Sequence, residues 1–129
     1  MFDGFSIGSS DLTQPTLGVD RDAEIVAFEF DERDPGMLEM LRLALRGAKR
    51  NSRRVGICDE APANYPDIAG FLTGLGIDSI GVNPANLLRT IEVVRQVELR
   101  GPLVSKRHET SSRFPPTAHR VISTCRFGR

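Results

Sequence analysis

Three short apolar runs, separated by segments with helical periodicity, restrict the folds open to this chain more than any other feature. The runs are residues 5–7, 55–58 and 79–82, and each is bounded by Gly, Asp or Asn. Runs of this kind are typical of strands that are buried on both faces. Because each connection is long enough to hold a helix, the strands are expected to be parallel neighbours in βαβ units. The predicted fold class is α/β.

The connecting segments carry apolar residues at spacings of three and four. The first helix is expected to begin after Asp34, which is a favourable N-cap residue. The second is expected over about residues 66–75, because Gly76 can take the left-handed conformation that ends many helices. The third is expected to open at Asn83 and Pro84, a cap followed by proline in the first turn.

A sheet of three strands would leave two unpaired edges and bury little apolar surface. The chain has 129 residues, which is enough for one domain. The pattern therefore indicates part of a larger parallel sheet. The chain alone is expected to associate with itself or with another chain through its exposed edges.

Composition excludes several classes of protein. The chain is 40% hydrophobic and 26% charged, as in ordinary globular domains. Its apolar stretches end well before the roughly 18 residues of a spanning helix, and no apolar leader is recognisable, so a cytoplasmic protein without a membrane partner is expected. Cys58 and Cys125 form neither a CxxC metal motif nor a disulfide framework, so neither zinc nor a disulfide is predicted.

The last stretch of the chain differs from the rest. Residues 100–129 are rich in Gly, Ser, Thr, Pro and Arg without a sustained period, and they are predicted to form a basic, largely disordered tail. The stretch from residue 101 holds six basic residues and one acidic residue, although the whole chain has no net charge. No aromatic platform accompanies the basic residues of 50–54, so nucleic acid is not an expected partner.

Candidate site residues follow the first two predicted strands. Ligands in parallel α/β folds bind beyond the carboxyl ends of the strands, which selects residues 8–11 and 58–60. Asp11 and Cys58 should then face one rim, where a carboxylate suits a hard cation and a thiol can transfer a proton. Two plainer interpretations stay open: Cys58 as a small core residue, and Asp11 as a cap of a helix over residues 12–17.

The two segments belong to a longer series of sequence blocks. These blocks are FDGFSIGSSDLTQ at 2–14, LGVDRD at 17–22, FDERDP at 30–35, VGIC at 55–58, GIDSI at 76–80 and Asn83-Pro84. In order and spacing the series resembles phosphoenolpyruvate synthases across about residues 2–98. Pyruvate phosphate dikinase and enzyme I of the sugar phosphotransferase system have a similar barrel, but the FDGF and FDER blocks favour the synthase branch.

The resemblance implies a partial (β/α)₈ barrel, in which residues 1–99 form the last three β/α units. A complete barrel of this type has about 250 residues and eight strands. It also implies that the complete enzyme is a phosphotransferase that converts ATP, pyruvate and water to phosphoenolpyruvate, AMP and phosphate through a phosphorylated histidine on a mobile domain. ATP would be used by the full-length enzyme only.

The resemblance also implies roles for individual residues. Cys58 would be the catalytic proton donor at the methyl or methylene carbon. Gly8, Ser9, Ser10 and Asp11 would contact the pyruvate or phosphoenolpyruvate, and Asp11 would also be a ligand of Mg²⁺. An enolate that forms beside Mg²⁺ has its charge stabilised while a thiol delivers the proton, so the chemistry of these residues agrees with those roles.

Two residues depart from the family pattern. Ser10 stands where the family has Asn, which replaces an amide that donates and accepts by a shorter hydroxyl. Asp59 stands where the family has Gly, which places a carboxylate beside Cys58 and a side chain where close backbone approach is possible. Either change is expected to weaken the site.

The second acidic Mg²⁺ ligand and the substrate-binding arginines of the family belong to the upstream barrel, so this chain alone is expected to be inactive. Two other interpretations stay open. One is a noncatalytic remnant that acts as a binding module. The other is one half of a split enzyme that is completed by an upstream half-barrel chain.

Overall fold

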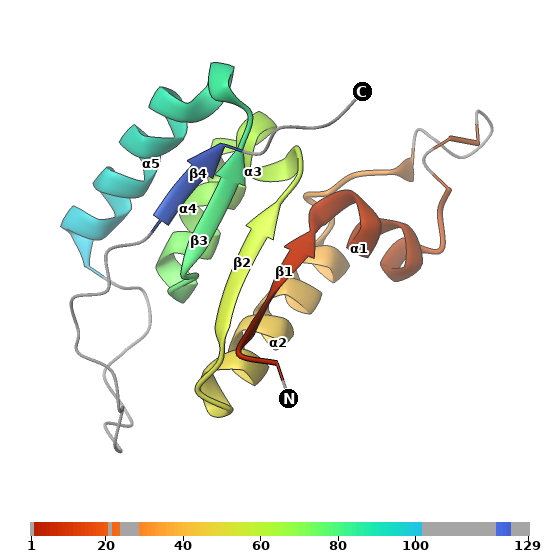
Figure 1. Ribbon diagram of the computed structural model, residues 1–129. Coiled ribbons are helices and arrows are strands. Elements are labelled where there is room, and N and C mark those ends of the chain that lie inside the picture. Colours follow the sequence, from red (N-terminus) through yellow and green to blue (C-terminus); the bar gives the residue numbers. More distant parts are fainter. Residues whose placement is uncertain (1, 21, 24–28, 102–120, 125–129) are drawn as a thin grey trace.

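The computed structural model describes residues 2–20, 22–23, 29–101 and 121–124, and it contains an open parallel sheet with the order β1-β2-β3-β4 (Figure 1). The strands are β1 (Gly4–Gly8), β2 (Arg54–Cys58), β3 (Ser79–Val82) and β4 (Val121–Thr124). The α-helices are α1 (Ser9–Leu17), α2 (Pro35–Arg50), α3 (Ala61–Asn64), α4 (Pro66–Leu75) and α5 (Leu87–Arg100), and a short 3₁₀ helix, η2 (Pro84–Asn86), precedes α5. Three strands that alternate with helices in this way confirm the α/β class and agree with a partial barrel.

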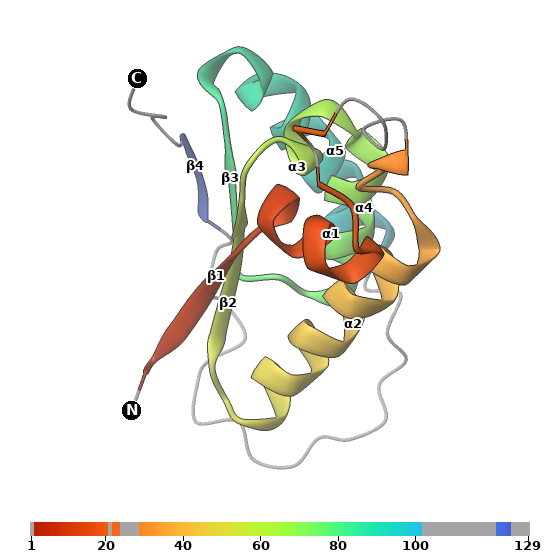
Figure 2. The same ribbon diagram turned by 90° about the vertical axis from the view of Figure 1, so that its right-hand side faces the viewer.

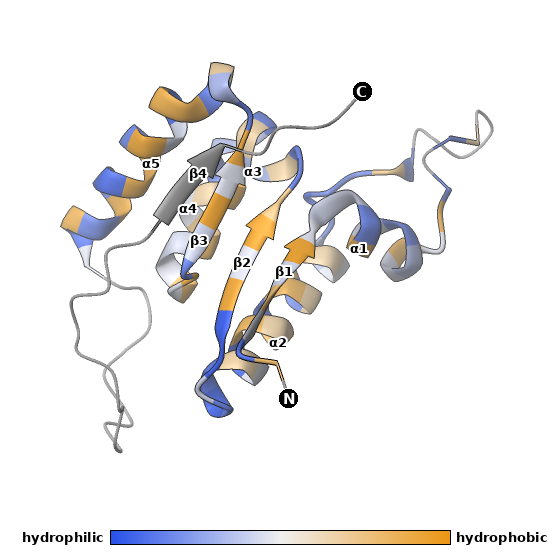
Figure 3. Cartoon of the chain, in the orientation of Figure 1, coloured by the Kyte–Doolittle hydropathy of each residue, from blue (hydrophilic) through white to orange (hydrophobic). Residues whose placement is uncertain are grey.

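The helices lie on one face of the sheet (Figure 2). Apolar side chains of alternating strand positions point toward them, so that Ile7, Ile57 and Ile80 are all at most 8% exposed. The positions between them hold small or polar residues, among them Ser6, Gly56 and Ser79, and Figure 3 shows the alternation along β2 and β3. Three consecutive residues are buried in β2 and in β3, as expected of strands that are buried on both faces, whereas in β1 only Ile7 is buried.

On the face of the sheet opposite the helices, small or polar residues of neighbouring strands lie side by side in one row. The register pairs Ser6 with Gly56 and Gly56 with Ser79. A Cβ atom at Gly56 would come within 2.3 Å of the Ser79 Oγ atom, so glycine leaves the space that this hydroxyl occupies. The face opposite the helices, which would line the interior of a barrel, thus carries small or polar residues from β1 to β3.

The structure confirms two of the predicted helix ends and changes the third prediction. The Asp34 side chain accepts a hydrogen bond from the Gly36 amide at 2.7 Å and caps α2. Gly76 ends α4 with φ of 81°, the left-handed conformation expected for it. Asn83 accepts a hydrogen bond from the Asn86 amide at 3.0 Å, but it caps η2, and α5 begins only at Leu87. Two elements were not expected: the single turn of α3, and β4 within the predicted tail.

Strand β4 lies along the outer edge of β3. The two strands run parallel, with Ser79 opposite Val121 and Val82 opposite Thr124. Residues 102–120 and 125–129, the remainder of the predicted tail, lie outside the described residues. The sheet thus has a fourth strand that was not predicted from the sequence, and β1 and β4 are its edge strands among the described residues. Within the described residues no helix is both long and apolar enough to cross a membrane.

Candidate functional site

The two candidate segments, residues 8–11 and 58–60, follow neighbouring strands. They meet at the carboxyl end of the sheet, which we call the rim. Gly8, the last residue of β1, lies opposite Cys58, the last residue of β2. Helix α1 begins at the next residue, Ser9, while the chain after Cys58 turns through Asp59 into α3. The structure therefore brings residues 8–11 and 58–60 together, as expected from parallel strands that end on one side of a sheet.

Cys58 is a free, partly buried cysteine at the end of β2. Its Sγ atom accepts a hydrogen bond from the Ser6 Oγ atom at 3.6 Å and donates one to the Ile7 carbonyl oxygen at 3.6 Å. Both partners belong to β1, so the thiol is held across the strand pair, where it is only partly buried. The plainer interpretation of Cys58 as a core residue does not describe this environment, because hydrogen-bonding groups of β1 hold the thiol at the rim.

Asp11 lies in the first turn of α1 and is exposed. Its carboxylate folds back over Gly8, where an added Cβ atom would come within 2.8 Å of the Asp11 Oδ2 atom. A side chain at position 8 would therefore require the exposed Asp11 carboxylate to shift. The N-cap position belongs to Gly8, three residues before the expected cap, so the interpretation of Asp11 as the cap of residues 12–17 is wrong.

Asp11 is the rim residue predicted to hold a metal ion. Among the described residues, no group of three or more His, Cys, Asp and Glu side chains is placed to hold a metal ion. Asp11 offers one exposed carboxylate, an oxygen ligand of the kind that Mg²⁺ prefers. This chain thus fits a magnesium ion in part, and the other ligands would be water, substrate or residues outside it.

Glu32 belongs to the same site, although it was not among the site residues predicted from the sequence. It is only 6% exposed, and its Oε1 atom accepts hydrogen bonds from the hydroxyls of Ser9 at 2.6 Å and Ser10 at 3.3 Å. The Ser9 hydroxyl in turn accepts a bond from the Ala61 amide at 3.3 Å. Glu32 therefore joins the start of α1 to the segment after β2. The sequence signal that could have identified Glu32 is its position in the FDERDP block at residues 30–35.

The loop that carries Glu32 is fixed at several points. The Arg33 guanidinium pairs with Asp31 at 3.0 Å and lies over the Tyr65 ring at 4.7 Å from its centre. The hydrogen bonds from Arg33 hold the pKa of Asp31 below its ordinary value. Asp34 anchors the end of the loop as the cap of α2. These contacts place Glu32 beneath the rim.

Asp59 lies across the amino end of α1. Its Oδ2 atom accepts a hydrogen bond from the Ser10 amide at 3.0 Å, and its Oδ1 atom accepts one from the Glu60 amide at 3.0 Å. Its backbone has φ of 98°, a left-handed conformation that glycine adopts far more readily than aspartate. The Asp59 carboxylate therefore accepts a hydrogen bond from an amide at the start of α1 that could otherwise bind an anion.

The comparison with known protein families agrees with this geometry. The family described as PEP-utilising enzyme, PEP-binding domain, matches residues 1–99. This range contains both rim segments. The chain belongs to this family. The match ends at the carboxyl-terminal part of α5, so β4 and the remainder of the chain lie beyond it.

Several similar relatives carry the name of one enzyme, phosphoenolpyruvate synthase. The chain is 54% identical over 98 residues to a phosphoenolpyruvate synthase of Synechocystis, and 50% identical over 98 residues to that of Helicobacter pylori. A phosphoenolpyruvate synthase of Aquifex aeolicus is 49% identical over the same length. Each match covers 76% of this chain and only 11–12% of the relative. The chain therefore spans a small part of these enzymes.

The buried position of Glu32 predicts how stability depends on pH. Burial raises the pKa of Glu32, and the nearby Asp59 and Glu60 carboxylates raise it further, while the Ser9 and Ser10 hydroxyls lower it. In the pH range between the ordinary pKa of a glutamate, about 4.3, and the raised pKa, the folded chain binds more protons than the unfolded chain. The contribution of Glu32 to the free energy of unfolding should therefore decrease as pH rises through this range.

Two substitutions of Glu32 separate its charge from its hydrogen bonds. In Glu32→Gln, an amide oxygen still accepts from the serines, so urea unfolding measured across pH should show a flatter profile with little loss at neutral pH. Glu32→Ala leaves two buried hydroxyls without their acceptor and should lower the free energy of unfolding by about 2 kcal/mol. Glu92→Gln, at an exposed position on α5, serves as the control. An unchanged pH profile in Glu32→Gln would contradict the assignment.

Proposed function

We propose that residues 1–99 supply the pyruvate- and phosphoenolpyruvate-contacting rim of a phosphotransferase of the phosphoenolpyruvate synthase type, and that turnover requires the remainder of the barrel. The observation that carries the proposal is the register of Gly8 opposite Cys58, which sets Asp11 and the thiol on one rim. The complete reaction would convert ATP, pyruvate and water to phosphoenolpyruvate, AMP and phosphate.

The residues of the rim suit the transfer of a proton at carbon 3 of the substrate. In synthesis, the Cys58 thiolate would accept a proton from the methyl group, the C–H electron pair would form the double bond between carbons 2 and 3, and the carbonyl π electrons would move onto the enolate oxygen. That oxygen would then bond to phosphorus as the bond between phosphorus and a histidine nitrogen breaks. In the reverse direction the thiol is the donor to the methylene carbon. Bound Mg²⁺ would supply positive charge beside the enolate oxygen, with Asp11 as one ligand.

The start of α1 suits the anionic end of the substrate. Gly8, Ser9 and Ser10 precede or open the helix, where backbone amides and the helix dipole favour negative charge. Glu32 is a positioning residue here, because it bonds to both serine hydroxyls from below and has no contact of its own with the rim surface. The proposal thus assigns binding to α1 and proton transfer to the end of β2.

A noncatalytic remnant is the second candidate function, and one contact favours it. The Ser10 amide already has an acceptor in the Asp59 carboxylate, which would compete with the substrate for that amide. In that case the chain would keep the fold of the family and would bind phosphoenolpyruvate weakly.

The proposal is tested by ligand binding in a chimera, in which this chain replaces the 98 matched residues of the Synechocystis relative. Calorimetry should detect Mg²⁺-dependent binding of phosphoenolpyruvate, and Asp11→Asn should weaken it at least about tenfold, as expected for loss of a charged ligand. Asp67→Asn is the matched control, because Asp67 is also an exposed carboxylate in a first helical turn, that of α4.

Equal weakening by Asp11→Asn and Asp67→Asn would reject the role of Asp11. Absence of binding in a folded chimera would favour the noncatalytic remnant.

A further inference from the structure

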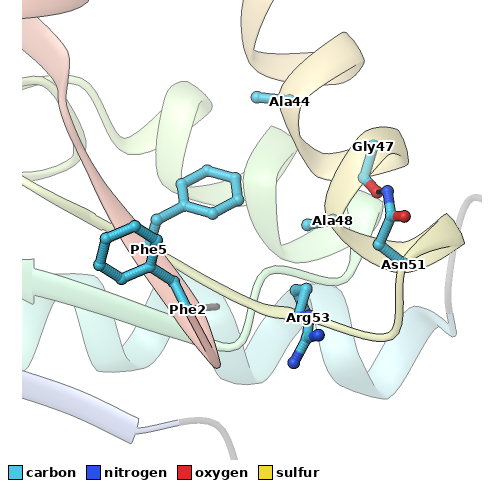
Figure 4. Close-up of a pocket in the computed structure, with 7 residues that line it drawn as sticks. All are labelled: Phe2, Phe5, Ala44, Gly47, Ala48, Asn51 and Arg53. Carbon is cyan, nitrogen blue, oxygen red and sulfur yellow. Dashed lines mark hydrogen bonds between the residues drawn. The ribbon is translucent and has the colours of Figure 1, made fainter.

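The middle of β1 carries one hydroxyl, that of Ser6, on the face of the sheet opposite the helices. Phe5, the preceding residue, lines a groove together with residues of α2, among them Ala48, on the helix side of the sheet (Figure 4). Side chains alternate along a strand, so Ser6 lies on the other face. Cys58 also lies on that face, because it stands two residues after Gly56, the register partner of Ser6. Ser6 and Cys58 are therefore neighbours on one face of the sheet.

Two glycines leave the space between these side chains clear. The register pairs Ser6 with Gly56 and Gly8 with Cys58. Neither glycine has a side chain, so those of Ser6 and Cys58 can lean diagonally across the strand pair toward each other. The Ser6 Oγ atom lies 3.6 Å from the Cys58 Sγ atom and would also lie 3.6 Å from a Cβ atom at Gly56. The contact between serine and cysteine thus follows from the order of small residues in the two strands.

The two hydrogen bonds of the thiol respond differently when the thiol loses its proton. The neutral thiol donates to the Ile7 carbonyl oxygen. A thiolate has no hydrogen to donate, so this contact would then join a carbonyl oxygen and an anion. The Ser6 hydroxyl donates to the Sγ atom, and such a bond becomes stronger when its acceptor is ionised. Of the two partners, Ser6 is therefore the one that favours the thiolate.

We propose that Ser6 is a positioning residue of Cys58, and that its hydroxyl orients the sulfur atom and stabilises the thiolate. The thiolate is the reactive form of a cysteine, so Ser6 controls how much of the chain has Cys58 ready to react. The part that this plays in proton transfer rests on the proposed function, whereas the effect on the thiolate does not. Ser6 acts through Cys58 and is assigned no contact with the substrate.

Alkylation of Cys58 tests the inference on the full chain without any substrate. The rate with iodoacetamide is followed by mass spectrometry of the peptide that contains Cys58, and Cys125 in the same sample is the internal reference. Ser6→Ala should slow alkylation of Cys58 at least about threefold at about pH 7, because loss of one hydrogen bond to a charged group lowers the fraction of thiolate. Ser6 is exposed, so alanine removes no buried contact.

The pH profile separates an effect on the thiolate from a change in access to the sulfur atom. At about pH 10, where thiols are largely ionised, Ser6→Ala should react no more slowly than the unsubstituted chain, because a less stabilised thiolate is the better nucleophile. The carboxylates nearest to the thiol in the rim segments, those of Asp11, Asp59 and Glu60, are the same in every variant. The difference between variants therefore reports on the hydroxyl.

Two further variants complete the test. Ser6→Thr keeps the hydroxyl and should keep the alkylation rate of the unsubstituted chain at both pH values. Ser79→Ala is the matched control, because Ser79 is also opposite Gly56 but belongs to β3, on the other side of β2 from Ser6. It should leave the rate unchanged.

Several results would overturn the inference. An unchanged rate in Ser6→Ala is one, and slowing of equal size at both pH values is another, because it would indicate altered access to the sulfur atom. Equal slowing in Ser79→Ala, or in Ser6→Thr, would assign the effect to packing of this face and not to the hydroxyl. A folded chimera that does not bind phosphoenolpyruvate would reject the proposed function and leave the effect of Ser6 on the thiolate standing.

Discussion

Replacing Ser10 by Asn and Asp59 by Gly together should raise the rate of phosphoenolpyruvate formation by the chimera at least about 100-fold, which corresponds to about 2.7 kcal/mol of transition-state stabilisation. The physical reason lies at the start of α1. The Asp59 carboxylate accepts the hydrogen bond of the Ser10 amide, and its removal frees that amide for a substrate oxygen. Asparagine at position 10 adds a side chain that can both donate and accept.

The stability of the chimera should change little in the single variant Asp59→Gly, so a gain in rate from this change can be read as a property of the site. Asp59→Gly loses two hydrogen bonds, worth about 1 kcal/mol each, to the amides of Ser10 and Glu60. It also removes a non-glycine residue from φ of 98°, a conformation that costs about 1–3 kcal/mol. The two effects are of similar size and opposite sign.

The single variants and one further substitution identify which property of Asp59 matters. Asp59→Asn keeps the size of the side chain and removes its charge, so a gain from this variant alone would assign the effect to charge. A gain from Asp59→Gly only would assign it to occupation of the amide. The rate is measured with a coupled assay for phosphoenolpyruvate, with ATP and pyruvate saturating. No gain in the double variant, in a chimera that binds phosphoenolpyruvate, would reject the view that these two residues weaken the site.

The fold was predictable from the sequence where neighbouring residues determine the local structure. The helix caps at Asp34 and Asn83 and the left-handed residue Gly76 each depend on a few neighbouring residues, and the structure places all three at helix or 3₁₀ ends. The three strands were also found, with shifts of no more than one residue at their ends. Local chemistry decides these features, so sequence alone is sufficient.

Features that depend on distant contacts were not predictable in the same way. Strand β4 exists only through its pairing with β3, some forty residues earlier, and its own segment has no strand-like period. The lower burial of β1, in which only Ile7 is buried, depends on which layers surround the strand, and a run of three apolar residues does not specify those layers. Glu32 lies in a loop, and its role depends on hydroxyls more than twenty residues away. In each case the missing information is tertiary.

Cys58→Ala, made in the chimera that carries Asn at position 10 and Gly at position 59, should lower the rate of phosphoenolpyruvate formation at least about 1,000-fold, within the range that acid–base catalysis supplies. The thiol is the rim group of β2 that can carry a proton, and Ser6 and Ile7 hold its Sγ atom from the neighbouring strand. Alanine keeps the small volume and removes the proton carrier. Because the thiol is assigned no part in substrate binding, the affinity for phosphoenolpyruvate should change less than about threefold.

A partial reaction separates proton transfer from all other steps. Exchange of deuterium from solvent into the methyl group of pyruvate, followed by NMR, requires only that the C–H bond breaks and re-forms at the site. This exchange should disappear in Cys58→Ala and in Cys58→Ser, because the hydroxyl of serine is far less acidic than a thiol. Cys125→Ala is the matched control, since Cys125 lies outside the segment that matches the family. Exchange that persists in Cys58→Ala would assign the proton to another group, and loss in Cys125→Ala as well would show that general damage, and not the thiol, is being measured.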